Sequence, residues 1–407
     1  MKLLILFAAN LFPVKGMYQV RVYNQIKYLA GRHKVDFANV VKGHDSIETT
    51  KNKLIGLVED YYPLKPKLLT NSRWYRGLCK LKHLAAYYCS QQTKEEIAIN
   101  TPSLNRQIRS ILTAKDYEAV IIHYWYWGYL FKSIGDKALK IIDTHYVVEE
   151  NLELFEQGHY QAANRKRLHK ELLYSLRKQQ EYFDLSDLIV VNSRKQAALI
   201  SDKVKSDKIV VAENGQDLRE YLNYNSEVDP HSVLFYGALS SQFNRLALQR
   251  ILKTIYPGIL SKDPQARLVL VGSNPPLELI GQYSYPNMVV TGFVDDIKPH
   301  LARCAVMLLP LETGSGFRGR AIEVLALGVP IVGTENGLQS VGISHGIQGF
   351  ITQTDEGTIS HALQLMTDAD LRQQVSANAR EFVAKNYSLE ATFGKLDQAM
   401  TMAYPEF

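Results

Sequence analysis

The stretch of residues 314–334, which reads GSGFRGRAIEVLALGVPIVGT, limits what this chain can fold into more than any other part of the sequence. Residues 306–310 precede it as an apolar run that ends at a proline, which predicts a buried strand. The glycines predict a loop, the apolar spacing that follows predicts a helix, and Gly328 and Pro330 end that helix before a second buried strand. Strand, loop, helix and strand in this order predict an α/β fold with a parallel sheet.

The start of the predicted helix has the features of an anion-binding site. Glycines let backbone N–H groups crowd around an anion, and a helix N-terminus carries a partial positive charge. Arg318 and Arg320 fall in the first turn, where cations oppose the helix dipole, and a bound dianion would explain their position. Glu323 lies one turn later and can accept hydrogen bonds from hydroxyl groups, so the stretch suits a sugar nucleotide. The alternative is a plain strand-to-helix loop whose arginines pair with Glu312 or Glu323, and the local pattern alone favours neither.

This stretch resembles the nucleotide-sugar signature of the family-four retaining glycosyltransferases, in the variant Gly-Ser-Gly-x-Arg-x-Lys/Arg-x-x-Glu followed by Gly-x-Pro. The matching residues are Gly314, Ser315, Gly316, Arg318, Arg320, Glu323, Gly328 and Pro330. The resemblance implies that residues 314–318, which include Phe317, bind the donor, that Arg320 and Glu323 act in catalysis, and that Glu323 also binds the ribose hydroxyls. Many members carry a further glutamate where this chain has Ser315, so a carboxylate contact to the donor sugar is absent here or supplied by another residue.

Size and composition predict two domains in a reducing compartment. The chain has 407 residues, and Lys plus Arg exceed Asp plus Glu by 47 − 41 = 6, an excess that fits an anionic substrate, a membrane surface or a plain soluble enzyme. The cysteines at 79, 89 and 304 lack the spacing of metal ligands. No apolar run is long enough to span a bilayer, and residues 1–9 fit a buried strand better than a signal peptide. We therefore expect a cytoplasmic protein, with the inner face of the membrane as an alternative location.

The first half of the chain opens as a doubly wound domain, in which ligands bind at the carboxyl ends of the strands. An apolar run at 3–9, a helical pattern at 20–29 ended by Gly31, and a second apolar run at 35–40 give this order. The segment that contains Gly16 and Arg21 resembles the first loop and helix of the same glycosyltransferases, where the glycine lies beside the donor and the arginine faces the acceptor. Judged without the resemblance, Gly16 is equally well a turn glycine.

Two polar or aromatic segments follow buried strands in this half. Tyr124 and Trp125 come directly after the apolar run 120–122 and could shape an acceptor cleft, although tryptophans are more often core residues. Asp143-Thr144-His145 follows the strand-like run 139–142. It resembles the family's aspartate-x-histidine, in which the histidine reaches the donor sugar, and on this resemblance His145 is a candidate catalytic residue.

Residues 65–94 combine basic and aromatic side chains and contain no acidic residue. Such a segment can lie on an anionic membrane surface, or it can be an ordinary helix with solvated lysines. The membrane interpretation gains weight if the acceptor is linked to a lipid, as it is for many members of the family.

The second half repeats the α/β pattern, with strand-like runs that end in glycine or small polar residues. Their order matches the family's second domain. The resemblance implies that Asn244 and Arg245 lie in a loop on the phosphate side and that Phe293 and Val294 hold the base.

These patterns predict two Rossmann-like doubly wound domains that face each other across a cleft, the GT-B fold. We expect an acceptor-binding domain at 1–217, a linker at 218–231, a nucleotide-sugar-binding domain at 232–385 and a final helix at 386–407 that crosses back to the first domain. The implied activity is retaining, metal-independent transfer of a sugar from a UDP- or GDP-linked donor to a saccharide or lipid-linked hydroxyl, without a cofactor, in the assembly of cell-envelope polysaccharide or glycolipid. No Asp-x-Asp follows a central strand, so arginines, loop N–H groups and the helix dipole would carry the diphosphate charge.

Two alternatives remain open at this point. The same fold serves nucleotide-sugar epimerases and phosphorylases, although the sequence shows no distinctive site for a lysine-bound cofactor. The basic excess also allows a nucleic-acid-binding or DNA-modifying protein, which would bind duplexes in a salt-sensitive way. We expect no nucleic-acid partner, because the basic residues are spread over helices and the strand-end loops suit a small anionic ligand.

Overall fold

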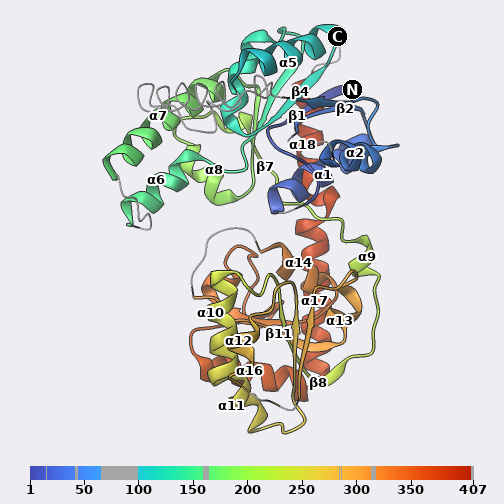
Figure 1. The fold of residues 1–407 in the computed structure, drawn as a ribbon, viewed down its shortest axis with the longest axis vertical. Helices are drawn as coiled ribbons and strands as arrows, with labels where there is room; N and C mark the ends of the chain where they lie inside the picture. Colours follow the sequence, from blue (N-terminus) through green and yellow to red (C-terminus); the bar gives the residue numbers. More distant parts are fainter. Residues whose placement is uncertain are drawn as a thin grey trace, which may run out of the picture. The chain divides into compact units, whose positions relative to one another are not determined.

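The computed structural model describes residues 1–14, 16–41, 45–65, 100–158, 165–283, 285, 287–312 and 318–404. The chain divides into two compact units, one formed by Met1–Gly215 together with Leu389–Phe407 and the other by Gln216–Ser388. Each unit is a parallel sheet with helices packed on it (Figure 1). Strands that are covered on both faces are apolar along their whole length, which is why the sequence shows them as continuous apolar runs.

In the described part of the first unit, the sheet has seven parallel strands in the order β3-β2-β1-β4-β5-β6-β7. The strands are β1 (Lys2–Phe7), β2 (Lys34–Val40), β3 (Tyr61–Leu64), β4 (Ala119–His123), β5 (Leu139–Asp143), β6 (Leu188–Val191) and β7 (Ile209–Val211). The helices are α1 (Met17–Ala30), α2 (Asp45–Leu54), α5 (Pro102–Ala114), the 3₁₀ helix η1 (Trp125–Ser133), α6 (Val148–Glu156), α7 (Arg165–Asp184), α8 (Arg194–Ile200), η2 (Ser206–Lys208) and α18 (Leu389–Ala403). The strand order changes direction between β1 and β4, and in such sheets ligands bind at the carboxyl ends of the strands beside that point.

Helices cover both faces of this sheet. Because successive side chains of a strand point to opposite faces, Leu4 and Leu6 of β1 belong to one buried cluster and Leu3, Ile5 and Phe7 to the other. The first cluster includes residues of α5, η1 and α7, and the second includes residues of α1 and α18. Helix α18 therefore packs beside α1, although the two are far apart in the sequence (Figure 1).

In the described part of the second unit, the sheet has six parallel strands in the order β10-β9-β8-β11-β12-β13. The strands are β8 (Asp229–Tyr236), β9 (Arg267–Val271), β10 (Met288–Gly292), β11 (Cys304–Leu309), β12 (Ile331–Thr334) and β13 (Gly349–Thr352). The helices are α9 (Arg219–Leu222), α10 (Gln242–Arg250), the π-helical η3 (Ile251–Ile255), α11 (Tyr256–Leu260), α12 (Leu277–Ile280), α13 (Lys298–Ala302), α14 (Gly319–Ala326), α15 (Glu335–Leu338), α16 (Asp355–Thr367) and α17 (Ala369–Tyr387). Here the order changes direction between β8 and β11.

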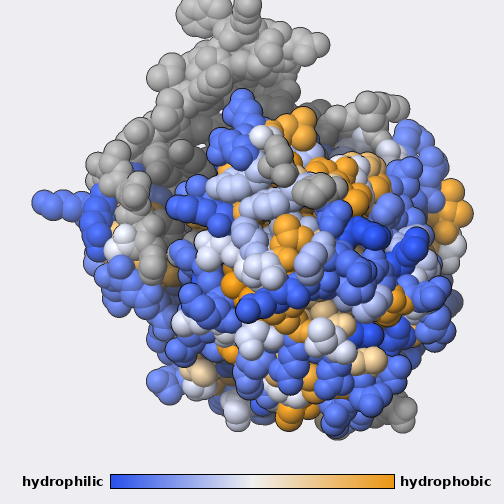
Figure 2. Space-filling view, turned by 90° about the horizontal axis from the view of Figure 1, so that it is seen from below, coloured by the Kyte–Doolittle hydropathy of each residue, from blue (hydrophilic) through white to orange (hydrophobic). Residues whose placement is uncertain are grey.

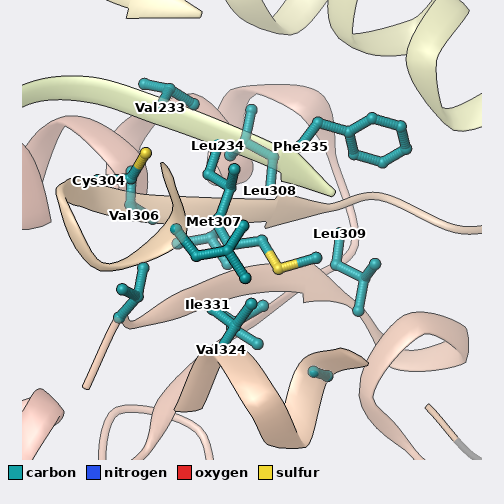
Figure 3. Packing of buried hydrophobic residues seen from close by; sticks show 14 of the residues in the cluster. Val233, Leu234, Phe235, Cys304, Val306, Met307, Leu308, Leu309, Val324 and Ile331 are labelled. Atoms are coloured by element: carbon teal, nitrogen blue, oxygen red, sulfur yellow. The ribbon is translucent and has the colours of Figure 1, made fainter. Parts of the chain in front are cut away.

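The core of the second unit centres on these two strands. Figure 3 shows Leu234 of β8 and Met307 of β11 close to Ile331 of β12 and Val324 of α14, and all four are fully buried. This packing fixes α14 against the sheet, directly after the carboxyl end of β11 in the chain.

The surface of the second unit is largely hydrophilic on the face drawn in Figure 2, where hydrophobic side chains are scattered among polar ones. Phe293 is the large hydrophobic side chain with the greatest exposure in the described residues, at 76%. Across the described part of the chain, no helix combines the length and the apolar composition that crossing a bilayer requires.

The structure differs from the sequence-based expectation at the linker and leaves two predicted segments outside its described residues. The predicted linker 218–231 lies in the second unit, where Leu218 is buried, α9 forms and β8 already begins at Asp229. The aromatic segment that follows the predicted strand 120–122 begins the 3₁₀ helix η1 at Trp125. Residues 66–99 and 313–317 lie outside the described residues, and they include nearly all of the basic segment and the loop with Gly314, Ser315, Gly316 and Phe317.

Candidate functional site

One candidate site lies in the second unit, at the start of α14. This helix buries Ala321, Ile322, Val324 and Leu325 against the core and leaves Arg320 and Glu323 partly exposed. Arg318 stands at the N-cap and is also partly exposed. Since α14 follows β11 beside the direction change of the sheet, its N-terminus occupies the position where such folds bind ligands.

Arg320 is held between the end of β8 and the start of α10. Its Nη1 donates to the carbonyl oxygen of Tyr236 at 3.1 Å, and its Nη2 donates to Oδ1 of Asn244 at 2.7 Å. Asn244 is buried and donates through Nδ2 to the carbonyl oxygen of Ala238 at 2.8 Å. Burial, together with the neighbouring charge of Arg318, lowers the pKa of Arg320 to about 10, so the guanidinium remains charged at neutral pH. The structure thus brings Arg320 and Asn244 together, and the neutral amide of Asn244 holds the charged guanidinium of Arg320 in a fixed orientation.

The close approach of Arg320 requires a glycine at position 237. A Cβ atom at Gly237 would lie 1.6 Å from Nη1 of Arg320, and the φ angle of +149° at Gly237 is one that other residues rarely adopt. The adjacent strand end has the same requirement, because a Cβ at Gly272 would lie 1.7 Å from the carbonyl oxygen of Gly237. Gly237 therefore leaves space for the Arg320 side chain, and Gly272 leaves space for the backbone of Gly237.

Glu323 has a carboxyl group whose pKa is raised well above its usual value. Its Oε2 accepts a hydrogen bond from the hydroxyl of Tyr236 at 3.1 Å. Burial raises the pKa of Glu323 to about 7, against the opposing effects of the Tyr236 hydrogen bond and the Arg320 charge. Burial and the nearby Glu323 carboxylate raise the pKa of Tyr236, so the tyrosine stays a neutral donor. Glu323 therefore changes its charge near neutral pH.

The other predicted donor-binding residues of this unit that the structure describes follow strand ends at the same edge of the sheet. Phe293 follows β10 directly and is strongly exposed, Val294 is partly buried against the core, and Arg245 is exposed on α10. Strand β10 stands two positions from β8 in the sheet. An exposed phenylalanine beside a strand end can stack on a flat ring, which is consistent with the predicted base contact.

A separate candidate site lies at strand ends in the first unit. His145 follows β5 and has a φ angle of +58°, and Tyr124 follows β4 and has a φ angle of +76°. The two rings stack with centroids 4.4 Å apart and planes 22° apart. Asn192 Nδ2 donates to the carbonyl oxygen of His145 at 2.7 Å and supports the left-handed backbone. Strained conformations of this kind cost on the order of 1–3 kcal/mol each and concentrate at functional sites.

Arg21 has a structural position, which corrects the prediction that it faces an acceptor. Its side chain is 0% exposed and forms an ion pair with Asp143, with Nη2 and Oδ2 2.9 Å apart. Nη1 of Arg21 also donates to the carbonyl oxygens of Ala212 and Glu213, both at 2.8 Å. The guanidinium therefore joins α1 to the end of β5 and to the segment after β7, where an acceptor has no access to it.

Trp125 and Gly16 also have identifiable structural roles. Trp125 is 1% exposed within the core cluster of η1 and α7, which corrects its assignment to acceptor binding. Tyr124 is partly exposed and remains a candidate acceptor contact. Gly16 is the N-cap residue of α1, and a Cβ there would lie 2.8 Å from the ring of Tyr18, a side chain that can move away.

Asp143 lies between two histidines, a combination of ligand types that can hold a metal ion. Donor atoms of His123, Asp143 and His145 lie within 4.8 Å of one another. However, both oxygens of Asp143 accept from Nε of Arg21 at 3.0 Å, and Oδ2 also accepts from Gln25 at 2.9 Å. A cation would have to displace a guanidinium, so we assign this group as an ion-pair and hydrogen-bond network.

Sequence reasoning missed four residues of the two groups, namely His123, Asn192, Tyr236 and Gln25. His123 and Tyr236 are the last residues of β4 and β8, and Asn192 directly follows β6. The position at a strand end was a usable signal for these three. Gln25 lies four residues after Arg21 on α1 and could have been found by helical spacing.

Comparison with known proteins finds a family match within the second unit. Residues 230–368 match the family described as "Glycosyl transferases group 1". Over 135 residues the chain is 32% identical to N-acetyl-alpha-D-glucosaminyl L-malate synthase of Bacillus anthracis, a match that covers 31% of this chain and 35% of that protein. It is 27% identical over 187 residues to trehalose phosphorylase of Grifola frondosa, covering 42% of this chain and 25% of the relative. The chain thus matches only about a quarter to a third of the length of these curated relatives.

A solved structure extends the likeness to the whole fold. HepE of Anabaena, crystallised in complex with UDP, has a TM-score of 0.66 with 14% identity, over 99% of this chain and 100% of that one. At this identity the likeness concerns the fold, which consists of two α/β units with parallel sheets. The chain has the GT-B fold, and its residues 230–368 match the family described as "Glycosyl transferases group 1".

Proposed function

We propose that this protein is a glycosyltransferase that moves a sugar from a nucleotide-diphosphate sugar to a hydroxyl acceptor. The observation that carries the proposal is the group of Arg320, Asn244 and Glu323 around the N-terminus of α14. It combines a fixed guanidinium with a carboxylate beside the direction change of the sheet, inside the stretch that matches the group 1 family. The guanidinium can bind a diphosphate, and the carboxylate can accept hydrogen bonds from ribose hydroxyls.

The proposed chemistry is departure of the nucleoside diphosphate, helped by positive charge. Arg318, Arg320 and the N-terminal end of the α14 dipole would stabilise the charge that develops on the leaving phosphate oxygen. The acceptor hydroxyl would attack the same face of the sugar as the diphosphate leaves, forming the new C–O bond as the old one breaks. The hydroxyl proton would pass to a phosphate oxygen. This front-face path retains the anomeric configuration and uses neither an enzymatic nucleophile nor a metal, in line with the resemblance to family-four enzymes.

The donor and the acceptor belong to the same proposal. Crystals of HepE contain UDP, which favours a UDP-linked donor over a GDP-linked one. We propose a saccharide or lipid-linked acceptor, in cell-envelope polysaccharide or glycolipid assembly. Contact of residues 65–94 with an anionic membrane surface stays a prediction, because residues 66–99 lie outside the described part of the chain.

Thermal unfolding with added nucleotides tests the proposed donor site. A ligand that binds only the folded state stabilises it by about 2.7 kcal/mol at a concentration 100 times its Kd, which raises Tm. We expect one of UDP, GDP and ADP, each measured in the presence of a chelator, to raise Tm by several degrees and to exceed its monophosphate. If none of the diphosphates shifts Tm, the donor-site assignment is wrong, and duplex DNA and RNA become the next ligands to test.

The affinity for the nucleoside part of the donor should rise with pH around neutrality. Ionised Glu323 accepts stronger hydrogen bonds from ribose hydroxyls than the protonated acid, and its pKa is about 7. Kd of the nucleoside should therefore fall as pH rises from 6 to 8 by about tenfold at most, since charge assistance roughly doubles a hydrogen bond. Nucleoside is used in place of diphosphate so that the ligand's own phosphate does not titrate.

Glu323→Gln is the matched variant, because the amide keeps the shape and removes the ionisation. The Kd of the nucleoside for Glu323→Gln should not depend on pH over this range.

The ionisation of Glu323 should also affect the free energy of unfolding. Because the folded pKa of Glu323 is raised above its usual value of 4.5, its favourable contribution is complete below that value and is lost as pH rises through about 7. A wild-type Kd as independent of pH as that of the variant would remove Glu323 from the ribose site.

A second candidate, phosphorolysis on the same fold, is favoured by the likeness to trehalose phosphorylase. The cationic group at α14 would then bind inorganic phosphate as the co-substrate. Incubation with trehalose and phosphate distinguishes the two, because a phosphorylase consumes phosphate and forms a sugar phosphate without any nucleotide. Transfer that depends strictly on a nucleotide sugar excludes this candidate.

A further inference from the structure

His123 and His145 form a hydrogen-bonded pair in the first unit, at the ends of β4 and β5. Nδ1 of His123 lies 3.0 Å from Nε2 of His145, so one of the rings donates and the other accepts. The His123 side chain is fully buried, and no described residue hydrogen-bonds its Nε2. No described partner is found for Nδ1 of His145, on a side chain that is partly exposed.

Two features of the surroundings indicate that His123 is the donor. Oδ2 of Asp143 lies 3.9 Å from Nδ1 of His123, and this negative charge favours a proton on that nitrogen. Arg21 is bound to the same carboxylate and cancels part of this preference. The second feature is the buried Nε2 of His123. If His123 accepted instead, this nitrogen would carry the proton as a buried N–H without an acceptor, a situation that is rare in folded proteins.

The charge state of the pair then fixes the form of His145. Burial lowers the pKa of His123 to about 4 and lowers that of His145 well below its usual value, so both rings are neutral at pH 7. A neutral imidazole has one proton, and the nitrogen of His145 that accepts from His123 cannot carry it. The proton of His145 therefore lies on Nδ1. The Asn192 bond to its carbonyl oxygen and the stack on Tyr124 hold the ring in this orientation.

We propose that His123 is a positioning residue that holds His145 in the Nδ1–H form, so that His145 donates a hydrogen bond to a sugar hydroxyl oxygen and does not act as a base. The sugar part of this inference rests on the proposed function, whereas the tautomer does not. Neither ring would contribute an ionisation near pH 6–7 to the pH profile of kcat/KM.

The tautomer is measured directly by two-bond ¹H–¹⁵N correlation NMR of the full chain labelled at its 11 histidines. His145→Gln and His123→Asn assign the two rings by loss of their signals. We expect Nδ1 of His145 to be protonated and its Nε2 to be unprotonated at pH 7, and the same pattern in His123. A His145 that carries its proton on Nε2, or on both nitrogens, overturns the proposal even if every variant is unstable.

Two variants of His123 separate positioning from packing. In His123→Asn the side-chain amide can donate from nearly the place of Nδ1, and His145 should stay in the Nδ1–H form. In His123→Leu this donor is lost, and His145 should shift to the Nε2–H form. An unchanged tautomer in His123→Leu contradicts the positioning role. The melting temperature of each variant shows whether it is folded under the conditions of the spectra.

Activity provides a second measurement on His145 itself. His145→Asn presents an amide near the position of Nδ1, whereas His145→Gln presents one near Nε2. Turnover of a sugar donor that carries the nucleotide identified by thermal shift should be about five- to tenfold higher in His145→Asn than in His145→Gln, since a neutral hydrogen bond contributes roughly 1 kcal/mol. Equal turnover with unequal stability would assign His145 to structure. If no nucleotide sugar is turned over by wild type, the proposed function fails, while the NMR result still decides the tautomer.

Discussion

Replacement of Arg320 with alanine should lower the affinity for the nucleoside diphosphate by about 10- to 100-fold, because hydrogen bonds to charged groups contribute about 1.5–3 kcal/mol each. Tyr236 and Asn244 already hold the guanidinium in the free protein, so its side chain loses little conformational entropy on binding. Titration calorimetry with the diphosphate measures the effect. The corresponding nucleoside, which lacks the phosphates, should lose much less affinity, only through the rise in the pKa of Glu323 that follows removal of the Arg320 charge.

Two further variants show whether the loss comes from charge or from structure. Arg320→Lys keeps a cation but cannot make both bonds of the guanidinium, and we expect an intermediate affinity. Arg219→Ala is the matched control, because Arg219 pairs with Asp217 at the surface of the same unit and has no role in the proposed site. Its Kd should equal that of wild type. If Arg320→Ala weakens nucleoside and diphosphate binding equally, the side chain supports the fold of the site and does not contact phosphate.

Asp143→Ala should lower the free energy of unfolding of the first unit by about 3–5 kcal/mol, the usual cost of breaking a buried ion pair on one side. The variant leaves Arg21 fully buried without its counter-charge. All three tryptophans lie before residue 215, at positions 74, 125 and 127, so the fluorescence change in urea reports the unfolding of this unit. The loss should appear as a lower midpoint with an unchanged slope.

The pH dependence of the same ion pair provides a check with a definite sign. Although burial alone would raise it, the Arg21 charge and the two histidines hold the pKa of Asp143 at about 2, below its usual value of 3.8. The contribution of Asp143 is therefore present above pH 3.8 and lost as pH falls through about 2, and the difference between wild type and variant should shrink in that window. Lys132→Ala, which removes an exposed pair with Glu181, should cost less than about 1 kcal/mol. An effect of Asp143→Ala as small as that of Lys132→Ala would show that the pair stabilises nothing.

The fold was largely predictable because buried parallel strands consist of continuous runs of apolar residues. Residues 3–7 and 304–309 form β1 and β11 as continuous buried segments. Strand β3 escaped prediction because Pro63 interrupts its pattern, which is tolerated at the edge of the sheet where β3 lies. The start of α14 was also found, because glycine, arginine and proline have distinct local preferences.

The individual roles of site residues were less predictable, because they depend on partners that are distant in the sequence. From the sequence alone, Arg21 could contact a ligand or form an ion pair with another residue. Its ion-pair partner Asp143 is 122 residues away. Trp125 has the composition of a sugar-stacking residue and lies instead in the core. For Arg320, the carbonyl of Tyr236 and the amide of Asn244 are 84 and 76 residues away. The contacts of Arg320, Glu323 and His145 with a donor stay predictions.

Gly237 and Gly272 have a consequence for anyone who would redesign this protein. A library that varies both positions would consist almost wholly of members in which strand ends collide with each other or with Arg320, because any side chain there overlaps existing atoms. Useful diversity has to enter elsewhere, for instance at the exposed side chains of Phe293 and Arg245, which can change size without moving the backbone. Under the proposed function, new donor preferences should therefore be sought by exchange at the exposed positions while the two glycines are kept constant.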